Sequence, residues 1–339
     1  MLLSAGSAIP QHLSSRASSS RRATAAATTG RRPARARAMA ARAASARAPE
    51  APVTDDAIRL AHDLADAAAR VTTRYFRTGV LADSKADDSP VTIADREAEE
   101  AMRALLLLRA PTHAVFGEEF GLTDAPHQVA DAAATKKGEG KLGDVPEWLW
   151  VLDPIDGTKS FVTGKPVFGT LVALLHRGEP VLGVIDQPVT RERWVGVRGR
   201  PTTLNGAPVR ARACPRVREA YAYATTPHMF APGPTADAWA RVRDACRIPL
   251  YGCDCYAYGL LAAGHVDLVV EADLKPYDYL ALVPVVEGAG GLITDWRGGK
   301  LRWTGGGGGG GGGEVVAAGD ARVHAEALGL LGWSSEQKE

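Results

Sequence analysis

Two carboxylates set three residues apart, Asp153 and Asp156 in the stretch D-P-I-D-G-T, are the residues of this chain best placed to do chemistry. An apolar run precedes them directly, which predicts a strand that delivers both acids into a turn. Gly157 and Thr158 then begin a short predicted helix, whose first backbone N–H groups suit an anion. Carboxylate oxygens are ligands that Mg²⁺ prefers, whereas softer metals favour histidine or cysteine. The stretch indicates a magnesium and phosphate site, and a plain tight turn is the alternative.

Three further acids favour the metal site over the plain turn. Glu118 follows a short apolar stretch that ends at Phe116, so a second strand also ends in an acid. Asp278 stands at a predicted helix start behind Pro276, a residue that fits the first helical turn because its missing N–H is not needed there. Asp95 lies at the mouth of a predicted helix that runs to about residue 109.

In their order along the chain, these acids and the residues around them resemble the motifs of the inositol monophosphatase family of Mg²⁺-dependent, lithium-sensitive phosphomonoesterases. The motifs that carry the resemblance are G-E-E at residues 117–119, D-P-I-D-G-T at 153–158, and Asp278 ahead of a late A-x-x-x-x-E-x-G-G-like stretch. The resemblance covers about residues 54–331 and implies the layered α-β-α-β-α sandwich of sugar phosphatases, of the α/β (α+β) class. It further implies an antiparallel sheet in the N-terminal half, a mixed sheet in the C-terminal half, and a homodimer.

The resemblance also implies a role for each acid in holding two to three Mg²⁺ ions. Glu118, Asp153 and the main-chain carbonyl of Ile155 would hold the first ion, and Glu118 would reach a third, weaker ion through water. Asp153, Asp156 and Asp278 would hold the second ion, so that Asp153 bridges the two.

Asp95 and Thr158 match the pair that activates the attacking water in this family. An N-cap is the alternative role for Asp95, and a simple helix-start residue is the alternative for Thr158. The amides of Gly157 and Thr158 would hold phosphate oxygens. Lys85, on the loop before Asp95, would add positive charge near the phosphate, or is a solvated lysine.

The stretches around Asp254 and Glu271 resemble the histidinol-phosphate phosphatase branch more than inositol phosphatases, which carry Gly-Ser-Ala before the helix and Trp before the last metal Asp. Here Asp254 and Tyr277 stand at those positions. Acids at the leaving-group end suit the cationic ammonium and imidazole of L-histidinol phosphate. Cys253 departs from the branch, where Gly is usual. We expect a histidinol-phosphatase of histidine biosynthesis; an inositol or other sugar-phosphate phosphatase, and a non-catalytic phosphate- or partner-binding relative, are the alternatives.

Residues 1–49 differ in composition from the rest of the chain. They contain nine Arg, no Asp or Glu, and much Ala, Ser and Thr, which is typical of an organelle transit peptide and predicts the chloroplast stroma. A basic nucleic-acid tail and an artefact of gene prediction are the alternatives. Without this segment 31 basic residues face 39 acidic ones, a net charge of −8, which argues against a nucleic-acid surface. No apolar run approaches the ~20 residues that a bilayer requires.

The rest of the 339-residue chain predicts two halves, 50–205 and 206–339. An amphipathic helix is expected from Asp55 to Phe76, a surface loop over 121–146, and three hairpin-joined strands between 167 and 197. Strands and helices alternate after 206, including one helix over 277–288 that Pro284 should kink. The glycine run 305–313 predicts an insertion without function. Four cysteines without zinc spacing predict buried free thiols, at residues 214, 246, 253 and 255.

Overall fold

The computed structural model describes residues 53–79, 83–84, 90–123, 145–305 and 313–333, all within a unit that spans 51–339. The predicted transit peptide, Lys85 and residues 306–312 of the glycine run lie outside the described residues. The expected division into two halves at residue 205 stays a prediction from sequence.

Helices and strands alternate in blocks along the described chain. The α-helices are α2 (Asp55–Tyr75), α3 (Ile93–Arg109), α5 (Thr158–Val162), α6 (Pro234–Ala245), α7 (Tyr256–Ala262), α8 (Pro276–Tyr279), α9 (Leu282–Gly288) and α10 (Ala321–Leu331). The strands up to residue 208 are β1 (Asp83–Ser84), β2 (Pro90–Val91), β3 (Ala114–Gly117), β4 (Gly121–Thr123), β5 (Trp148–Asp156), β6 (Gly169–His176), β7 (Glu179–Gln187), β8 (Glu192–Val197), β9 (Thr203–Leu204) and β10 (Ala207–Pro208). The later strands are β11 (Tyr221–Ala224), β12 (Ile248–Tyr251), β13 (Leu268–Glu271), β14 (Leu292–Asp295) and β15 (Val315–Ala318).

Two sheets form the frame of the described unit. The first has eight strands in the order β10-β9-β8-β7-β6-β5-β3-β4 and is antiparallel throughout except for the parallel pair β3 and β5. The second has five strands in the order β12-β11-β13-β15-β14, with β11 parallel to both β12 and β13 and the remaining pairs antiparallel. The predicted antiparallel and mixed sheets are thus confirmed, with one parallel pair added to the first.

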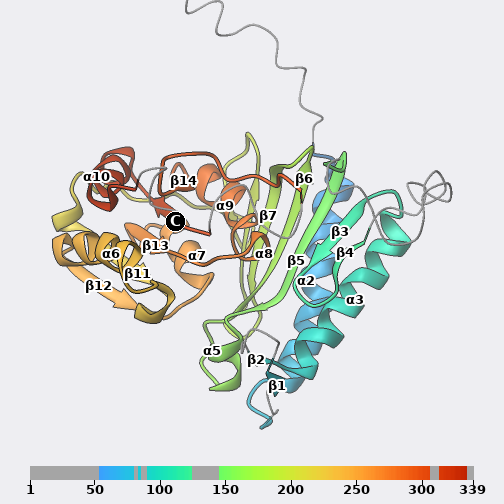
Figure 1. Ribbon diagram of the computed structural model, residues 1–339. Coiled ribbons are helices and arrows are strands. Elements are labelled where there is room, and N and C mark those ends of the chain that lie inside the picture. Colours follow the sequence, from blue (N-terminus) through green and yellow to red (C-terminus); the bar gives the residue numbers. More distant parts are fainter. Residues whose placement is uncertain (1–52, 80–82, 85–89, 124–144, 306–312, 334–339) are drawn as a thin grey trace, which may run out of the picture. The chain divides into compact units, whose positions relative to one another are not determined.

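The elements stack in five layers (Figure 1). Helices α2 and α3 cover one face of the eight-stranded sheet, and α7 and α9 pack on its other face, between the two sheets. Helices α6 and α10 close the far side of the five-stranded sheet. Three apolar clusters fill the four interfaces between these layers. Leu64 and Trp150 belong to the cluster under α2 and α3, and Trp239 to the cluster under α6 and α10. Trp194 and Tyr258 belong to the central cluster, which packs on both sides of the middle helices. This is the layered α-β-α-β-α arrangement predicted from sequence.

Helix α3 starts two residues earlier than predicted. Thr92 is its N-cap, and its hydroxyl accepts a hydrogen bond from the N–H of Ala94. Asp95 lies at the third helical position, and its carboxylate accepts the N–H of Thr92. The alternative reading of Asp95 as the N-cap is therefore wrong in position, because the capping box assigns the cap to Thr92.

Three other predictions of secondary structure are corrected. The helix expected over 277–288 is divided into α8 and α9, since the ring of Pro284 would collide with the carbonyl of Leu280 in a continuous helix; Pro284 lies instead in the first turn of α9. The expected loop after Gly121 begins with β4, which pairs with β3. The sequence analysis also missed β12, whose four residues are all exposed and show no alternation.

All four cysteines are free, as predicted. Cys214 and Cys255 are buried, whereas Cys246 and Cys253 are half-buried. Among the described residues, no helix is both long and apolar enough to cross a membrane.

Candidate metal and phosphate site

A bulge in β5 brings the two acids of the D-P-I-D-G-T stretch to the same side. Residues three apart in a regular strand point to opposite faces. In the pairing of β5 with β6, Asp153 lies opposite Leu171 but Asp156 lies opposite Gly169, so β5 carries one extra residue there. The hydroxyl of Thr170 donates to the carbonyl of Pro154 at 2.8 Å and supports the bulge.

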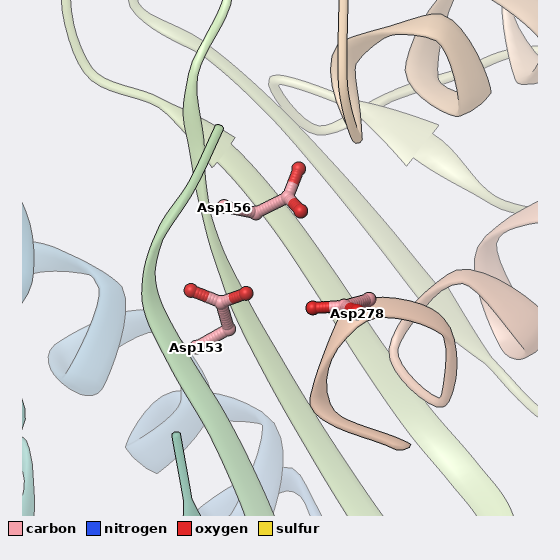
Figure 2. Close-up of side chains that lie close together, drawn as sticks. All are labelled: Asp153, Asp156 and Asp278. Atoms are coloured by element: carbon pink, nitrogen blue, oxygen red, sulfur yellow. The ribbon is translucent and has the colours of Figure 1, made fainter. Parts of the chain in front are cut away.

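The third acid of the cluster comes from the layer between the sheets. Figure 2 shows the carboxylates of Asp153 and Asp156 on β5 facing that of Asp278 on α8. One carboxylate oxygen from each of the three lies within 4.8 Å of the others. Asp278 is oriented by its own helix start, where its Oδ2 accepts the N–H of Lys275 at 2.6 Å.

Ionising these acids together is unfavourable. Burial raises the pKa of Asp153 well above its usual range, and the charges of Glu118, Asp156 and Asp278 raise it further. Burial also raises the pKa of Asp156 well above normal, with Asp254 and Asp278 adding to the effect. The pKa of Asp278 rises to about 8, again chiefly through burial. A bound cation would relieve both the desolvation and the repulsion.

The residues present fit Mg²⁺ better than a softer ion. The cluster offers carboxylate oxygens, which Mg²⁺ prefers, and burial raises the pKa of the nearby Cys255 thiol, which disfavours its thiolate form. Glu118 adds a fourth carboxylate, since it lies within hydrogen-bonding reach of Asp153. Its backbone N–H donates to the carbonyl of Leu152 at 3.2 Å, which fixes it beside the end of β5.

Asp95 and Thr158 meet next to this cluster. The hydroxyl of Thr158 lies 3.4 Å from Oδ1 of Asp95 and 3.2 Å from the carbonyl oxygen of Ile155, and its single proton can go to either acceptor. Asp95 is fully buried, and Thr92 supplies two donors to its other oxygen. The structure therefore brings together the proposed proton-transfer pair and the proposed carbonyl ligand.

Gly157 lets the second half of the chain approach the turn closely. Its φ of 86° lies in the left-handed region that favours glycine, and a Cβ there would meet the Asp254 carboxyl carbon at 2.7 Å. Asp254 accepts the hydroxyl of Ser160 at 2.7 Å. Burial raises its pKa, although the Ser160 bond and the charges of Lys165 and Lys159 oppose this effect.

The turn that carries Asp254 has unusual backbone geometry. Gly252, Cys253 and Asp254 have φ values of 98°, 85° and 44°, all in or near the left-handed region. The turn directs the N–H of Cys255 onto Oδ2 of Asp156 at 2.5 Å. A residue distant in sequence thus orients one acid of the cluster, which spacing alone could not reveal.

Glu271 is nearly fully buried, and both of its oxygens are engaged. Thr225 donates to one oxygen through its hydroxyl (2.5 Å) and its N–H (3.0 Å), and the hydroxyl of Tyr258 donates to the other at 2.8 Å. Burial raises the pKa of Glu271 to about 7. The sequence analysis missed these two partners. It also missed Lys159, which directly follows the D-P-I-D-G-T turn, and Lys165, which lies six residues further on.

The described unit thus combines a five-layered α-β-α-β-α body (Figure 1) with an acid cluster at a strand-to-helix turn, an arrangement suited to binding a metal ion and an anion. Residues 54–331 match the model of the inositol monophosphatase family. This chain belongs to that family of phosphatases, and the family depends on Mg²⁺.

Individual relatives narrow the comparison. The chain is 51% identical over 271 residues, 80% of its length and 73% of the relative's, to the bifunctional phosphatase IMPL2, chloroplastic, of Arabidopsis thaliana. It is 35% identical to the histidinol-phosphatase of Chlorobaculum parvum, over 71% of its own length and 86% of the relative's. Among solved structures it matches an inositol monophosphatase from Zymomonas mobilis with a TM-score of 0.68 at 44% identity, covering 82% of this chain and 98% of that one.

Proposed function

We propose that this chain is a Mg²⁺-dependent histidinol-phosphate phosphatase, which releases L-histidinol and phosphate in histidine biosynthesis. The observation that carries the proposal is the position of the Asp254 carboxylate, which stands against the phosphate turn at Gly157. The likeness to a histidinol-phosphatase and to a bifunctional phosphatase of the family supports the same assignment.

The metal ligands are Asp153, Asp156, Asp278, Glu118 and the carbonyl of Ile155. Bound Mg²⁺ supplies an activated water and neutralises charge on the ester oxygens. Asp95 accepts the proton of the attacking water through the hydroxyl of Thr158, which lies between Asp95 and the Ile155 carbonyl. The N–H groups of Gly157 and Thr158, at the start of α5, hold phosphate oxygens. Lys85, outside the described residues, would add positive charge there.

The leaving group lies toward Asp254 and Glu271. Among the described residues nothing donates a hydrogen bond to Oδ1 of Asp254, which leaves that oxygen for the substrate ammonium or imidazole. Glu271 has both oxygens engaged, so it acts on a cationic leaving group through its charge. Inositol carries hydroxyls only and gains less from these two acids.

An inositol or other sugar-phosphate phosphatase is the second candidate. The observation in its favour is the 44% identity to the Zymomonas mobilis inositol monophosphatase over most of both chains. The two candidates share the metal site and differ in the residues that meet the leaving group.

Phosphate release by a chain lacking residues 1–49, with Mg²⁺ and with EDTA, tests the proposal on histidinol phosphate and inositol 1-phosphate side by side. We expect Mg²⁺-dependent release with at least a tenfold preference for histidinol phosphate, equal to about 1.4 kcal/mol in the transition state. A preference for inositol 1-phosphate would keep the mechanism and overturn the substrate, and no release from either would leave the non-catalytic alternative.

A variant separates the substrate pocket from the metal site. Asp254→Asn keeps the shape of the side chain and its bond to Ser160, but removes the charge. We expect KM for histidinol phosphate to rise about tenfold or more, as for a lost charge-assisted hydrogen bond, with little change for inositol 1-phosphate. Asp244→Asn, at an exposed residue of α6, is the matched control.

We also propose import into the plastid stroma and a homodimeric assembly. The composition of residues 1–49 and the chloroplastic relative support the first. Fusion of residues 1–49 to a fluorescent protein tests import, and light scattering of the chain without them tests the dimer. A diffuse cytosolic signal or a monomer mass would overturn the respective proposal.

A further inference from the structure

We infer that Glu99 and Arg103, which no motif marks, form a positioning pair for the metal ligand Glu118. The inference rests on the proposed Mg²⁺ site and adds residues to it that the substrate or the ion does not touch. Glu118 lies on the turn between β3 and β4, and both residues of the pair contact this turn or the start of β4.

Glu99 is fully buried and binds the backbone of that turn. One carboxylate oxygen accepts the N–H of Glu119 at 2.7 Å, and the other accepts the N–H of Phe120 at 3.3 Å. The two donors are the residues that directly follow Glu118. A buried carboxylate that accepts backbone N–H groups fixes the path of the chain at those residues, because an unmade bond to a buried charge is expensive.

Arg103 neutralises Glu99 and extends its hold on the turn. Its Nε donates to Glu99 at 2.7 Å, with the Glu99 side chain fully buried and that of Arg103 17% exposed. Its two terminal nitrogens donate to the carbonyl of Gly121 at 2.5 Å and to the hydroxyl of Thr123 at 3.0 Å. The planar guanidinium thus ties the carboxylate of Glu99 to β4, a geometry that lysine cannot reproduce.

The Glu99 carboxylate lies directly against the backbone at Gly117, so a larger residue cannot replace this glycine without a shift of the carboxylate. A Cβ on Gly117 would meet Oε1 of Glu99 at 2.0 Å, so the glycine before Glu118 is required by the carboxylate that lies against it. On the other side, the N–H of Glu118 donates to the carbonyl of Leu152, the residue before Asp153. Glu118 is therefore held between α3 and the end of β5.

Helix periodicity explains why one element serves two parts of the site. Asp95, Glu99 and Arg103 are spaced four apart and share one face of α3. Asp95 reaches Thr158, and Glu99 reaches the turn of Glu118 one helical turn later. A shift of α3 would displace both at once.

The physical consequence concerns metal affinity more than the chemical step. Mg²⁺ requires near-ideal octahedral geometry at about 2.0–2.1 Å, so a ligand on a loose turn loses binding energy to ordering. Outer residues that orient metal ligands typically change affinity by about 10–100-fold when altered. Saturating Mg²⁺ would restore the geometry and hence the turnover.

The test uses full-length protein carrying Glu99→Gln, with Glu100→Gln at the adjacent exposed helix position as the matched control. Calorimetry measures Mg²⁺ binding without substrate, and hydrogen exchange measures residues 117–121 without Mg²⁺. We expect Mg²⁺ affinity at least tenfold weaker, faster exchange of the Glu119 and Phe120 amides, and kcat at saturating Mg²⁺ within about threefold of the parent. Glu100→Gln should match the parent in all three.

Unchanged Mg²⁺ affinity in a folded Glu99→Gln protein, or the same loss in Glu100→Gln, would overturn the inference. If Glu99→Gln does not fold, Arg103→Lys decides: it keeps the charge but breaks the fork to Gly121 and Thr123, and parent-like affinity in it would count equally against the pair. A parent protein that binds no Mg²⁺ would instead overturn the proposed function, and the exchange of residues 117–121 would still report on the turn.

Discussion

At Asp153, burial and three neighbouring carboxylates all oppose ionisation, yet the residue stands at the centre of the candidate site. Such an arrangement stores unfavourable electrostatic energy that a cation releases. Function and stability therefore make opposite demands on this side chain, as is common where perturbed carboxylates cluster.

Asp153→Asn should abolish Mg²⁺-dependent phosphate release, lowering the rate by about a thousandfold or more, because the central charge on the ions is lost. The same change should leave the metal-free protein folded and at least as stable, since it removes one member of the repelling set. Phosphate assays and thermal unfolding without Mg²⁺ check both parts. A rate of phosphate release close to that of the parent would contradict the assignment of Asp153 as a metal ligand.

The sequence predicted which acids would lie together, but not the geometry that brings them together. Acids at strand ends and the D-P-I-D-G-T spacing marked Asp153, Asp156 and Asp278. The β5 bulge and the N–H of Cys255 on Asp156 depend on pairing between distant segments, which leaves no local signature. Glu99 had a signal that was overlooked, its place one turn after Asp95 on the same helix face.

At the scale of elements, capped helix ends and glycine positions on strands determine how closely helices pack on the sheets. Asp320 caps α10 and accepts the N–H of Arg322 at 2.9 Å, and its other oxygen accepts the N–H of Cys214 at 3.1 Å. Hydrogen bonds from Arg322 lower the pKa of Asp320 to about 2. Amphipathic helices and alternating strands were predictable because their periods are local, and Pro284 marked the disturbance between α8 and α9, whereas the fully exposed β12 shows no local pattern.

Asp320→Ala should destabilise the protein by about 1 kcal/mol at neutral pH, as for other lost N-caps. Because the folded pKa lies below the unfolded value of about 3.9, the stabilisation is present above that value and is lost as pH falls toward about 2. Urea unfolding at pH 7 and at pH 3 should show the gap between parent and variant narrowing in acid. Glu100→Ala, on an exposed helix face, should show no such narrowing, and a gap independent of pH would contradict the assignment.

Gly183 of β7 and Gly196 of β8 are paired, so the sheet has no side chains at these two positions, where α9 packs on it. A Cβ at Gly183 would meet the carbonyl oxygen of Ala281 at 1.9 Å. We expect Gly183→Ala to lower the free energy of unfolding by about 1–3 kcal/mol through overpacking, measured by urea denaturation. Gly329→Ala, in α10 with open space around it, should stabilise by up to about 1 kcal/mol. Equal effects of the two changes would refute the close-packing argument.

At the scale of the whole unit, the candidate site joins separate layers. Asp153 and Asp156 belong to the eight-stranded sheet, Glu118 to its neighbouring turn, and Asp278 to the helical layer behind it. In the proposed function, Mg²⁺ would bind the assembled layers and not the unfolded chain. It should raise stability by about 2.7 kcal/mol at a hundred times its Kd, seen as a higher melting temperature on Mg²⁺ titration and not with NaCl at equal ionic strength. Asp153→Asn should lose this response.

The order of strands in the second sheet carries a consequence for synthesis of the chain. β15, close to the end of the described residues, lies between β13 and β14 and so is an inner strand that both neighbours require. β13 leads directly toward the helix of Asp278. In a nascent chain that stops before Val315, β13 and β14 lack the strand that lies between them, so we expect phosphatase activity to appear only after residues 315–318 have left the ribosome.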